Sequence, residues 1–149
     1  MIGLLQRVSQ AAVTVDGVQL AIIDAGVLVL VGVEKGDTTM EAARLAERIC
    51  GYRVFPDADG RMNLSVSDHG GGVLLVPQFT LAANTHKGLR ASFTTAADPA
   101  TGRLLYSELI DQVSARHEPV QSGSFGAHMA VSLINDGPVT FWLRVPPPV

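Results

Sequence analysis

Residues 27–33 read Val-Leu-Val-Leu-Val-Gly-Val, and this continuous apolar run decides the fold class of the chain. A half-exposed strand alternates apolar and polar residues, whereas a run without alternation is typical of a strand covered on both faces. Gly26 precedes the run and Glu34-Lys35-Gly36 follows it, so turn residues bound it at both ends. We therefore predict a central strand here, and a second buried strand at Val73–Val76, which follows three glycines.

Further strands are predicted on either side of these two runs. The N-terminal segment is rich in β-branched residues, and Asp16-Gly17 is a hairpin signal behind it. Near the other end, two apolar segments enclose the polar residues Asn135-Asp136-Gly137-Pro138, which predicts a second hairpin. The predicted strand segments are 2–15, 18–24, 53–55, 127–134 and 139–145.

Two amphipathic segments predict helices. Thr38-Thr39-Met40-Glu41 has the pattern of a capping box, and apolar residues at helical spacing then predict a helix over 39–50. Asp98-Pro99 gives an N-cap followed by proline, and Leu105, Leu109 and Val113 predict a helix ending near residue 117. The expected fold is a single mixed α/β domain over 1–145 with mainly antiparallel strands and two main helices. Residues 146–149 are expected to form a proline-rich tail.

Length and charge exclude several classes of protein. The chain has 149 residues, 47% of them hydrophobic, which fits one domain without a membrane span. Its first residues contain no basic segment followed by an apolar run and a cleavage site, so we expect a soluble, cytoplasmic protein. The 11 Lys and Arg against 14 Asp and Glu give a net charge of −3. This argues against a protein that holds long nucleic acid, although not against one that binds a short terminus.

No metal or cofactor site is predicted. Cys50 is the single cysteine and lies beside Ile49 at the end of the first helix, as a buried small hydrophobe would. The four histidines are too scattered for a zinc site, and Gly70-Gly71-Gly72 lacks the spacing of a phosphate-binding loop. The motifs of serine hydrolases, P-loop proteins and zinc proteases are absent.

Two polar segments remain as candidates for chemistry. Pro77-Gln78-Phe79-Thr80-Leu81 directly follows a buried strand, where ligand sites of α/β proteins gather. Thr80 is either a nucleophile, which would need an adjacent base such as His86, or a β-branched residue that extends the strand. The second segment is Asn135–Thr140. Its Gly137-Pro138 step is either part of a hairpin turn or a rigid cis peptide with a purpose.

The two segments together resemble the D-aminoacyl-tRNA deacylase family. The resemblance rests on Gln78-Phe79-Thr80-Leu81 and Asn135–Thr140, with support from Gln6-Arg7-Val8, Gly51–Phe55 and Met62-Asn63-Leu64, and covers residues 1 to 145. It implies a sheet sandwich or pseudo-barrel and an enzyme that works without a cofactor. That enzyme hydrolyses the ester of a D-amino acid, or of glycine on the wrong tRNA, at the 3′ end of the tRNA.

The resemblance also implies a role for each matching residue. Gln78, Phe79 and Thr80 would form the wall that holds the ester and the adenosine. Gly137 and Pro138 would be a cis chiral filter that enters the active site of the partner in a homodimer. Two further residues would assist: Arg7 would brace the filter, unless it is an ordinary exposed strand arginine, and Phe125 would lie against the adenine, unless it belongs to the core.

Pro77 departs from the family pattern, because serine usually stands at this position. Proline supplies neither a hydroxyl nor an N–H group. A Pro-Gln start also resembles a related branch of deacylases that has a trans Gly-Pro step and removes certain L-amino acids. Two alternatives therefore stay open: a deacylase of relaxed chirality, and a dimer that binds the tRNA end without catalysis.

Overall fold

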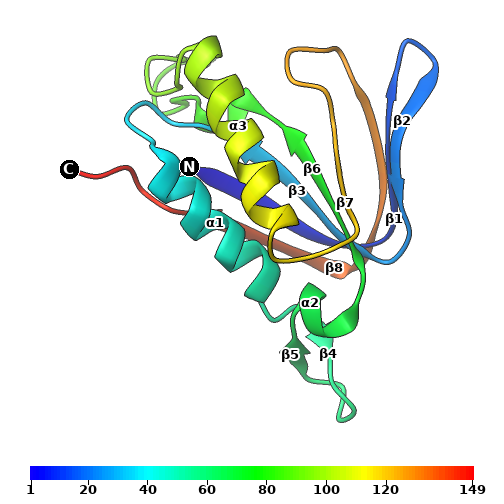
Figure 1. Cartoon of the computed structure of the whole chain (residues 1–149). Helices are drawn as coiled ribbons and strands as arrows, with labels where there is room; N and C mark the ends of the chain where they lie inside the picture. Colours follow the sequence, from blue (N-terminus) through cyan, green and yellow to red (C-terminus); the bar gives the residue numbers. More distant parts are fainter.

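The apolar run at 27–33 forms the strand in the middle of the main sheet. A computed structural model describes residues 1–149 (Figure 1). The strands of its main sheet are β1 (Ile2–Val15), β2 (Val18–Ile23), β3 (Gly26–Gly32), β6 (Gly72–Pro77), β7 (Val120–Ser122) and β8 (Ala130–Arg144). β3 pairs antiparallel with β1 and parallel with β6, so both of its edges are covered, as predicted.

The sheet is mixed. Its strand order is β2-β1-β3-β6-β7, and β8 pairs with the other side of β1. The pairings of β1 with β2, β3 and β8 are antiparallel, and those of β6 with β3 and β7 are parallel. The sheet curls toward a closed barrel, because β2 also approaches β6 and β7 across the curl. The predicted single α/β domain is confirmed.

Two long helices cover one face of this sheet (Figure 1). α1 (Thr39–Gly51) begins with the predicted capping box, in which Thr38 N donates to Glu41 Oε2 at 2.7 Å. α3 (Pro99–Ser114) begins at Asp98, whose side chain accepts a hydrogen bond from Thr101 N. The short elements are β4 (Phe55–Pro56), β5 (Met62–Leu64), α2 (Val66–His69) and the 3-10 helix η1 (Phe79–Ala82). No helix combines the length and the apolar character needed to cross a membrane.

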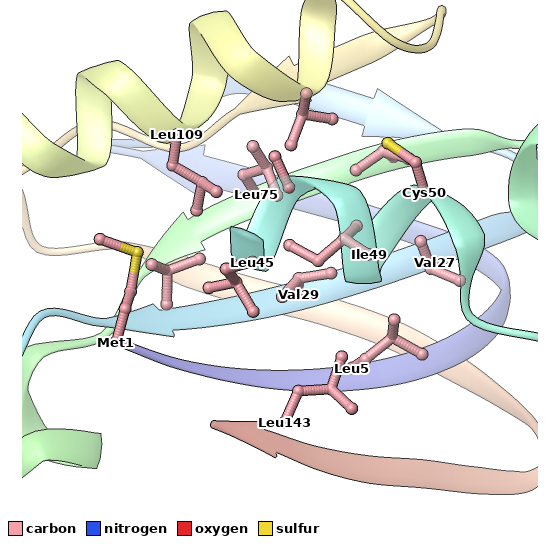
Figure 2. Close-up of a cluster of buried hydrophobic side chains, with 14 of the residues drawn as sticks. Met1, Leu5, Val27, Val29, Leu45, Ile49, Cys50, Leu75, Leu109 and Leu143 are labelled. Carbon is pink, nitrogen blue, oxygen red and sulfur yellow. The ribbon is translucent and has the colours of Figure 1, made fainter. Parts of the chain in front are cut away.

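The buried side chains form two clusters, one on each face of the sheet. The larger has 22 residues and lies between the sheet and the two long helices. Figure 2 shows Leu45 and Ile49 of α1 facing Val29 and Leu75 of the central strands. The smaller cluster has 8 residues, among them Leu28 and Leu74 on the opposite side of those strands. The unalternating runs are thus buried on both faces, which is why they lack polar residues.

The predicted hairpin at 127–145 is wrong. β8 is one strand of 15 residues that pairs with β1 along its length, without a turn at Asn135–Pro138. The register shifts instead, since Gln6 pairs with Thr140 and Val8 with Asn135, so that four residues bulge out opposite Arg7. Asp-Gly predicts a turn from local statistics alone, but here the fourteen-residue β1 provides a partner for both halves of the segment.

Candidate functional site

A cavity opens where β6 ends against the first turns of α3. Its volume is about 450 Å³, which is large enough for a small ligand. Ten of its 17 lining residues are hydrophobic, so it suits a largely apolar or aromatic group. The lining includes Gln78 and Phe79 from one sequence motif and Phe125, Ala127, His128 and Met129 from the segment that leads into β8. The fold thus brings together predicted site residues that lie more than 40 positions apart in the sequence.

Gln78, Phe79 and Thr80 form the turn that follows β6. Gln78 N donates to Val31 O at 2.7 Å, which ties the turn to β3, and η1 begins at the next residue. Thr80 therefore lies in a 3-10 helix and not in the strand extension that was one of its two predicted environments. Its hydroxyl accepts a hydrogen bond from Gln78 Nε2, and no titratable side chain contacts it. An amide cannot remove a proton, so this structure gives Thr80 no general base.

Gly32 fixes the position of this turn. A Cβ at residue 32 would lie 2.9 Å from Leu81 Cβ and 3.3 Å from Gln78 O. Carbon atoms pack at about 3.5–4.0 Å, so no larger residue fits without moving η1. The glycine in the run Val-Leu-Val-Leu-Val-Gly-Val thus lets η1 approach β3 closely.

Phe125 closes the cavity on the side of α3. Its ring lies 6.1 Å from that of Tyr106, and Gly102 leaves room for it, because a Cβ there would lie 3.2 Å from Phe125 Cζ. The ring is half-buried, so it belongs to the edge of the core and also faces the cavity. The predicted core position is therefore present, and the contact of Phe125 with the adenine stays a prediction.

Tyr106 holds the two sides of the cavity together. Its hydroxyl donates to Leu75 O at 2.8 Å and lies 3.3 Å from Gly123 O. Burial raises the pKa of Tyr106 well above its ordinary value, so the side chain is a neutral donor throughout the physiological range. Tyr106 was not identified from the sequence, because the predicted apolar stripe of its helix contains Leu105, Leu109 and Val113 but not residue 106.

Asn135–Thr140 forms a braced bulge on the exposed side of β8. Arg7 Nε donates to Asp136 O at 2.9 Å and Arg7 Nη1 to Val54 O at 2.6 Å. The Arg7 side chain is only 13% exposed, so it is not an ordinary exposed strand arginine. Asn135 Oδ1 accepts from Val139 N at 2.8 Å and closes the bulge from the other side.

Gly137 is the residue that this bulge requires. Its φ is +153°, and a Cβ would lie 2.6 Å from both Val139 N and Val139 Cγ2, so other residues would be strained there. The peptide bond between Gly137 and Pro138 is cis, as is that between Glu118 and Pro119. Both residues of the Gly-Pro step are exposed and project from the sheet.

The Gly-Pro step does not line the cavity of its own chain. The residue of β8 nearest to it in the lining is Val131, six positions before Gly137. The regular part of the strand between them, residues 131–135, spans about 13 Å. The structure thus brings Gln78, Phe79 and Phe125 together around one cavity, and leaves Gly137, Pro138 and Arg7 together at a separate place on the surface.

Pro77 is compatible with the end of β6. Gln78 N points toward β3, and because backbone N–H groups alternate in direction, position 77 points toward the β7 side. There β7 pairs with β6 only as far as Leu75 opposite Ser122. Proline at this position has no N–H with which to extend that ladder, and the pairing ends before it.

Comparison with known proteins agrees with this geometry. The family model described as D-Tyr-tRNA(Tyr) deacylase matches residues 4–144, which is nearly the whole chain. The chain belongs to this family. A D-aminoacyl-tRNA deacylase from Thioalkalivibrio sulfidiphilus is 66% identical to it over 99% of both chains.

Solved structures of the deacylase fold are also similar. A structure named "c-Myc DNA Unwinding Element Binding Protein" superposes with a TM-score of 0.94 at 36% identity, covering 98% of this chain and 99% of the other. One described as "a probable eukaryotic D-amino acid tRNA deacylase" has a TM-score of 0.79 at 19% identity, covering 97% and 98%, and this similarity concerns the fold alone. Family membership confirms the prediction that the chain is an enzyme of the deacylase class.

Three residues that shape the site were not identified from the sequence. Gly32, Gly102 and Tyr106 set the positions of η1 and Phe125. The two glycines could have been noticed in the sequence, because each interrupts an apolar strand or helix where no turn is predicted. The role of the Tyr106 hydroxyl could not be predicted from the sequence, because its acceptors are backbone carbonyls of β6 and of the segment after β7.

Proposed function

We propose that this protein hydrolyses the ester bond of D-aminoacyl-tRNA, and of glycine attached to the wrong tRNA, and spares L-aminoacyl-tRNA. The observation that supports this most directly is the cavity formed by Gln78, Phe79 and Phe125 in a chain of the deacylase family. Its volume and apolar character suit the terminal adenosine and an amino-acid ester. We take residues 1–145 as the deacylase domain, 146–149 as a tail outside it, and the cytoplasm as its location.

The proposed reaction is attack of water on the ester carbonyl carbon. A new C–O bond forms to the water oxygen, the bond to the ribose oxygen breaks, and a proton from the water passes to that ribose oxygen. Free amino acid and tRNA leave. The 2′-hydroxyl of the adenosine assists, because Thr80 has only the Gln78 amide beside it and no base. In this proposal Gln78, Phe79 and Thr80 position the ester, and Phe125 contacts the adenine.

Chiral selection is assigned to the braced bulge. When the ammonium and the ester of the substrate are both fixed, the two enantiomers direct their side chains differently. Carbonyl groups of the Gly137-Pro138 segment accept hydrogen bonds from the ammonium and obstruct the direction of an L side chain. Glycine has no side chain to obstruct. The hydrogen bonds from Arg7 and to Asn135 favour this role, because a wall must be stiff to discriminate.

The filter is proposed to act across a homodimer. Gly137 and Pro138 do not line the cavity of their own chain, which favours a role in the cavity of another copy. β8 also has a free outer edge with exposed Val131, Ile134 and Trp142 at 37%, 59% and 60% of their accessible surface. Long apolar edge strands of this kind are usually covered by a partner.

The test is release of amino acid from D-Tyr-tRNA at catalytic enzyme concentration, with light scattering to measure the mass. We expect repeated turnover by a dimer. Stoichiometric binding of tRNA without ester loss would contradict the enzyme and favour a tRNA-end-binding dimer. A fully active monomer at micromolar concentration would contradict the cross-subunit filter.

A further inference from the structure

Acidic residues are missing from the segments around the cavity. No Asp or Glu stands between Asp68 and Asp98, or between Glu118 and Asp136, although the chain has 14 of them. These two stretches supply most of the cavity lining, and Asp98 is the single carboxylate among the lining residues. The cavity lining is therefore poor in negative side chains, although the chain carries a net charge of −3.

The first of these stretches contains a projecting basic loop. Asn84 and Ser92 exchange two backbone hydrogen bonds of 2.7 and 2.9 Å, which close the base of a loop over residues 85–91, here called the basic arm. Lys87 and Arg90 are exposed on it and form no ion pair or hydrogen bond. The Leu89 side chain is fully exposed, so the tip of the arm rests on nothing in this chain.

The basic arm begins beside the cavity. The ring of Phe93, one residue beyond its base, lies 5.1 Å from the ring of Phe79, which lines the cavity. Thr95 Oγ1 donates to Ala82 O and ties the other end of the segment to η1. In Figure 1 this green segment lies at the end of the molecule where α3 begins.

Arg103 adds a third cation next to the same cavity. Its guanidinium carbon lies 4.9 Å from the centre of the Phe125 ring, and the side chain has no acidic partner. By contrast, Arg7, Arg44 and Arg144 each form an ion pair elsewhere. A guanidinium held over a ring keeps its N–H groups available for a phosphate.

We propose that the basic arm and Arg103 bind phosphates of the single-stranded 3′ end of tRNA as it enters the cavity. This rests on the proposed function, because it names how the same substrate is held outside the reacting centre. Three cations suit a short terminus and would not hold a long duplex, which agrees with the acidic net charge. Contacts of this kind position the strand and do not read its sequence.

The experiment compares two double variants that remove equal charge. Lys87→Gln with Arg90→Gln neutralises the arm, and Arg44→Gln with Arg61→Gln is the matched control away from the cavity, on α1 and between β4 and β5. All four side chains are exposed, and the one interaction removed is the surface ion pair of Arg44 with Glu47, so both variants should unfold close to the wild-type temperature. Binding of deacylated tRNA is measured against salt concentration, and hydrolysis is measured with D-Tyr-tRNA and with the D-tyrosyl ester of adenosine, which has no phosphate.

Each single-stranded phosphate contact contributes about 0.7 to the slope of log K against log salt, hence about a factor of 5 at roughly 0.1 M salt. We expect the arm variant to weaken tRNA binding about 25-fold, to lower the slope by about 1.4, and to leave the adenosine ester unaffected. The control variant should match wild type in all three measurements.

Three results would overturn the proposal: an equal loss in both variants, a similar loss on the adenosine ester, or a change in dimer mass caused by the arm variant. The last would assign the arm to the partner subunit. If wild type hydrolyses neither ester, the proposed function fails. The tRNA binding data still decide the role of the arm, since deacylated tRNA needs no catalysis.

Discussion

Replacement of Gly32 by alanine tests how closely the site depends on the sheet beneath it. The new Cβ would lie 2.9 Å from Leu81 Cβ, whereas carbon atoms pack at about 3.5–4.0 Å. η1 must therefore move by roughly 0.6–1.1 Å to make room. Phe79 and Thr80 lie between Gln78 and Leu81 in the sequence. A shift of η1 therefore moves these two residues, which are proposed to position the ester.

We expect Gly32→Ala to lower both the rate of catalysis and the free energy of unfolding. A misplacement of about 1 Å can reduce a rate about 100-fold, so we expect kcat/KM on D-Tyr-tRNA to fall about 10- to 100-fold. This corresponds to roughly 1.4–2.7 kcal/mol of transition-state stabilisation. Overpacking should also lower the free energy of unfolding by about 1–3 kcal/mol.

Gly51→Ala is the matched control, and the assays are kcat/KM and thermal unfolding. A Cβ at residue 51 meets no atom within 4 Å, and its backbone is helical. This variant should keep full activity and gain up to about 1 kcal/mol of stability. Full activity of Gly32→Ala together with its reduced stability would contradict this prediction, because it would show that the position of η1 does not limit the reaction.

Three further predictions follow from the site. Thr80→Ala should lower kcat/KM about 10- to 100-fold without any acyl-enzyme in mass spectra, and tRNA ending in 2′-deoxyadenosine should resist wild-type enzyme. Complete loss with a trapped acyl-enzyme would make Thr80 the nucleophile. Pro77→Ser should change kcat/KM by less than about 100-fold, because proline at 77 leaves the backbone groups of Phe79 and Thr80 in place; a larger gain would show that the family serine hydroxyl is needed. Hydrogen bonds from the Thr101 side chain and backbone lower the pKa of Asp98, so its ionised form favours folding above about pH 4 and that contribution is lost as the pH falls. Asp98→Ala should therefore lower the melting temperature at pH 7 and approach wild type near pH 3, with Asp98→Asn as a capping control; an equal difference at both pH values would contradict it.

The elements specified by local sequence were predictable. The capping box at Thr38 and the Asp98-Pro99 signal located α1 and α3, because a helix start depends on side chains within one turn. The central strand was also predictable, since burial on both faces removes every polar residue from it.

The long strand β8 was not predictable in the same way. Asn135–Pro138 has the composition of a turn, and the alternative, a bulge within one strand, depends on β1 being long enough to pair with both halves. No residue near Asn135–Pro138 in the sequence indicates that β1 pairs with both halves of the segment. The 3-10 helix at Phe79 has a similar cause, since it is set by the approach of Leu81 to Gly32 on a neighbouring strand.

The candidate site was likewise predictable only in part. Gln78, Phe79 and Phe125 were identified from a family resemblance and do line one cavity. Tyr106 was missed, because its hydroxyl bonds backbone carbonyls that only the tertiary structure brings near. The basic arm was also missed, although the absence of acidic residues from 69 to 97 was visible in the sequence.

Stereoselectivity is decided by the ratio of first-order rates on D-Tyr-tRNA and L-Tyr-tRNA, measured side by side at equal enzyme concentration. We expect the D ester and Gly-tRNA to be hydrolysed while the L ester decays at its spontaneous rate. A ratio of at least about 100 would mean that the braced segment discriminates by roughly 2.7 kcal/mol. Comparable rates on the two enantiomers would contradict the filter and leave a deacylase of relaxed chirality.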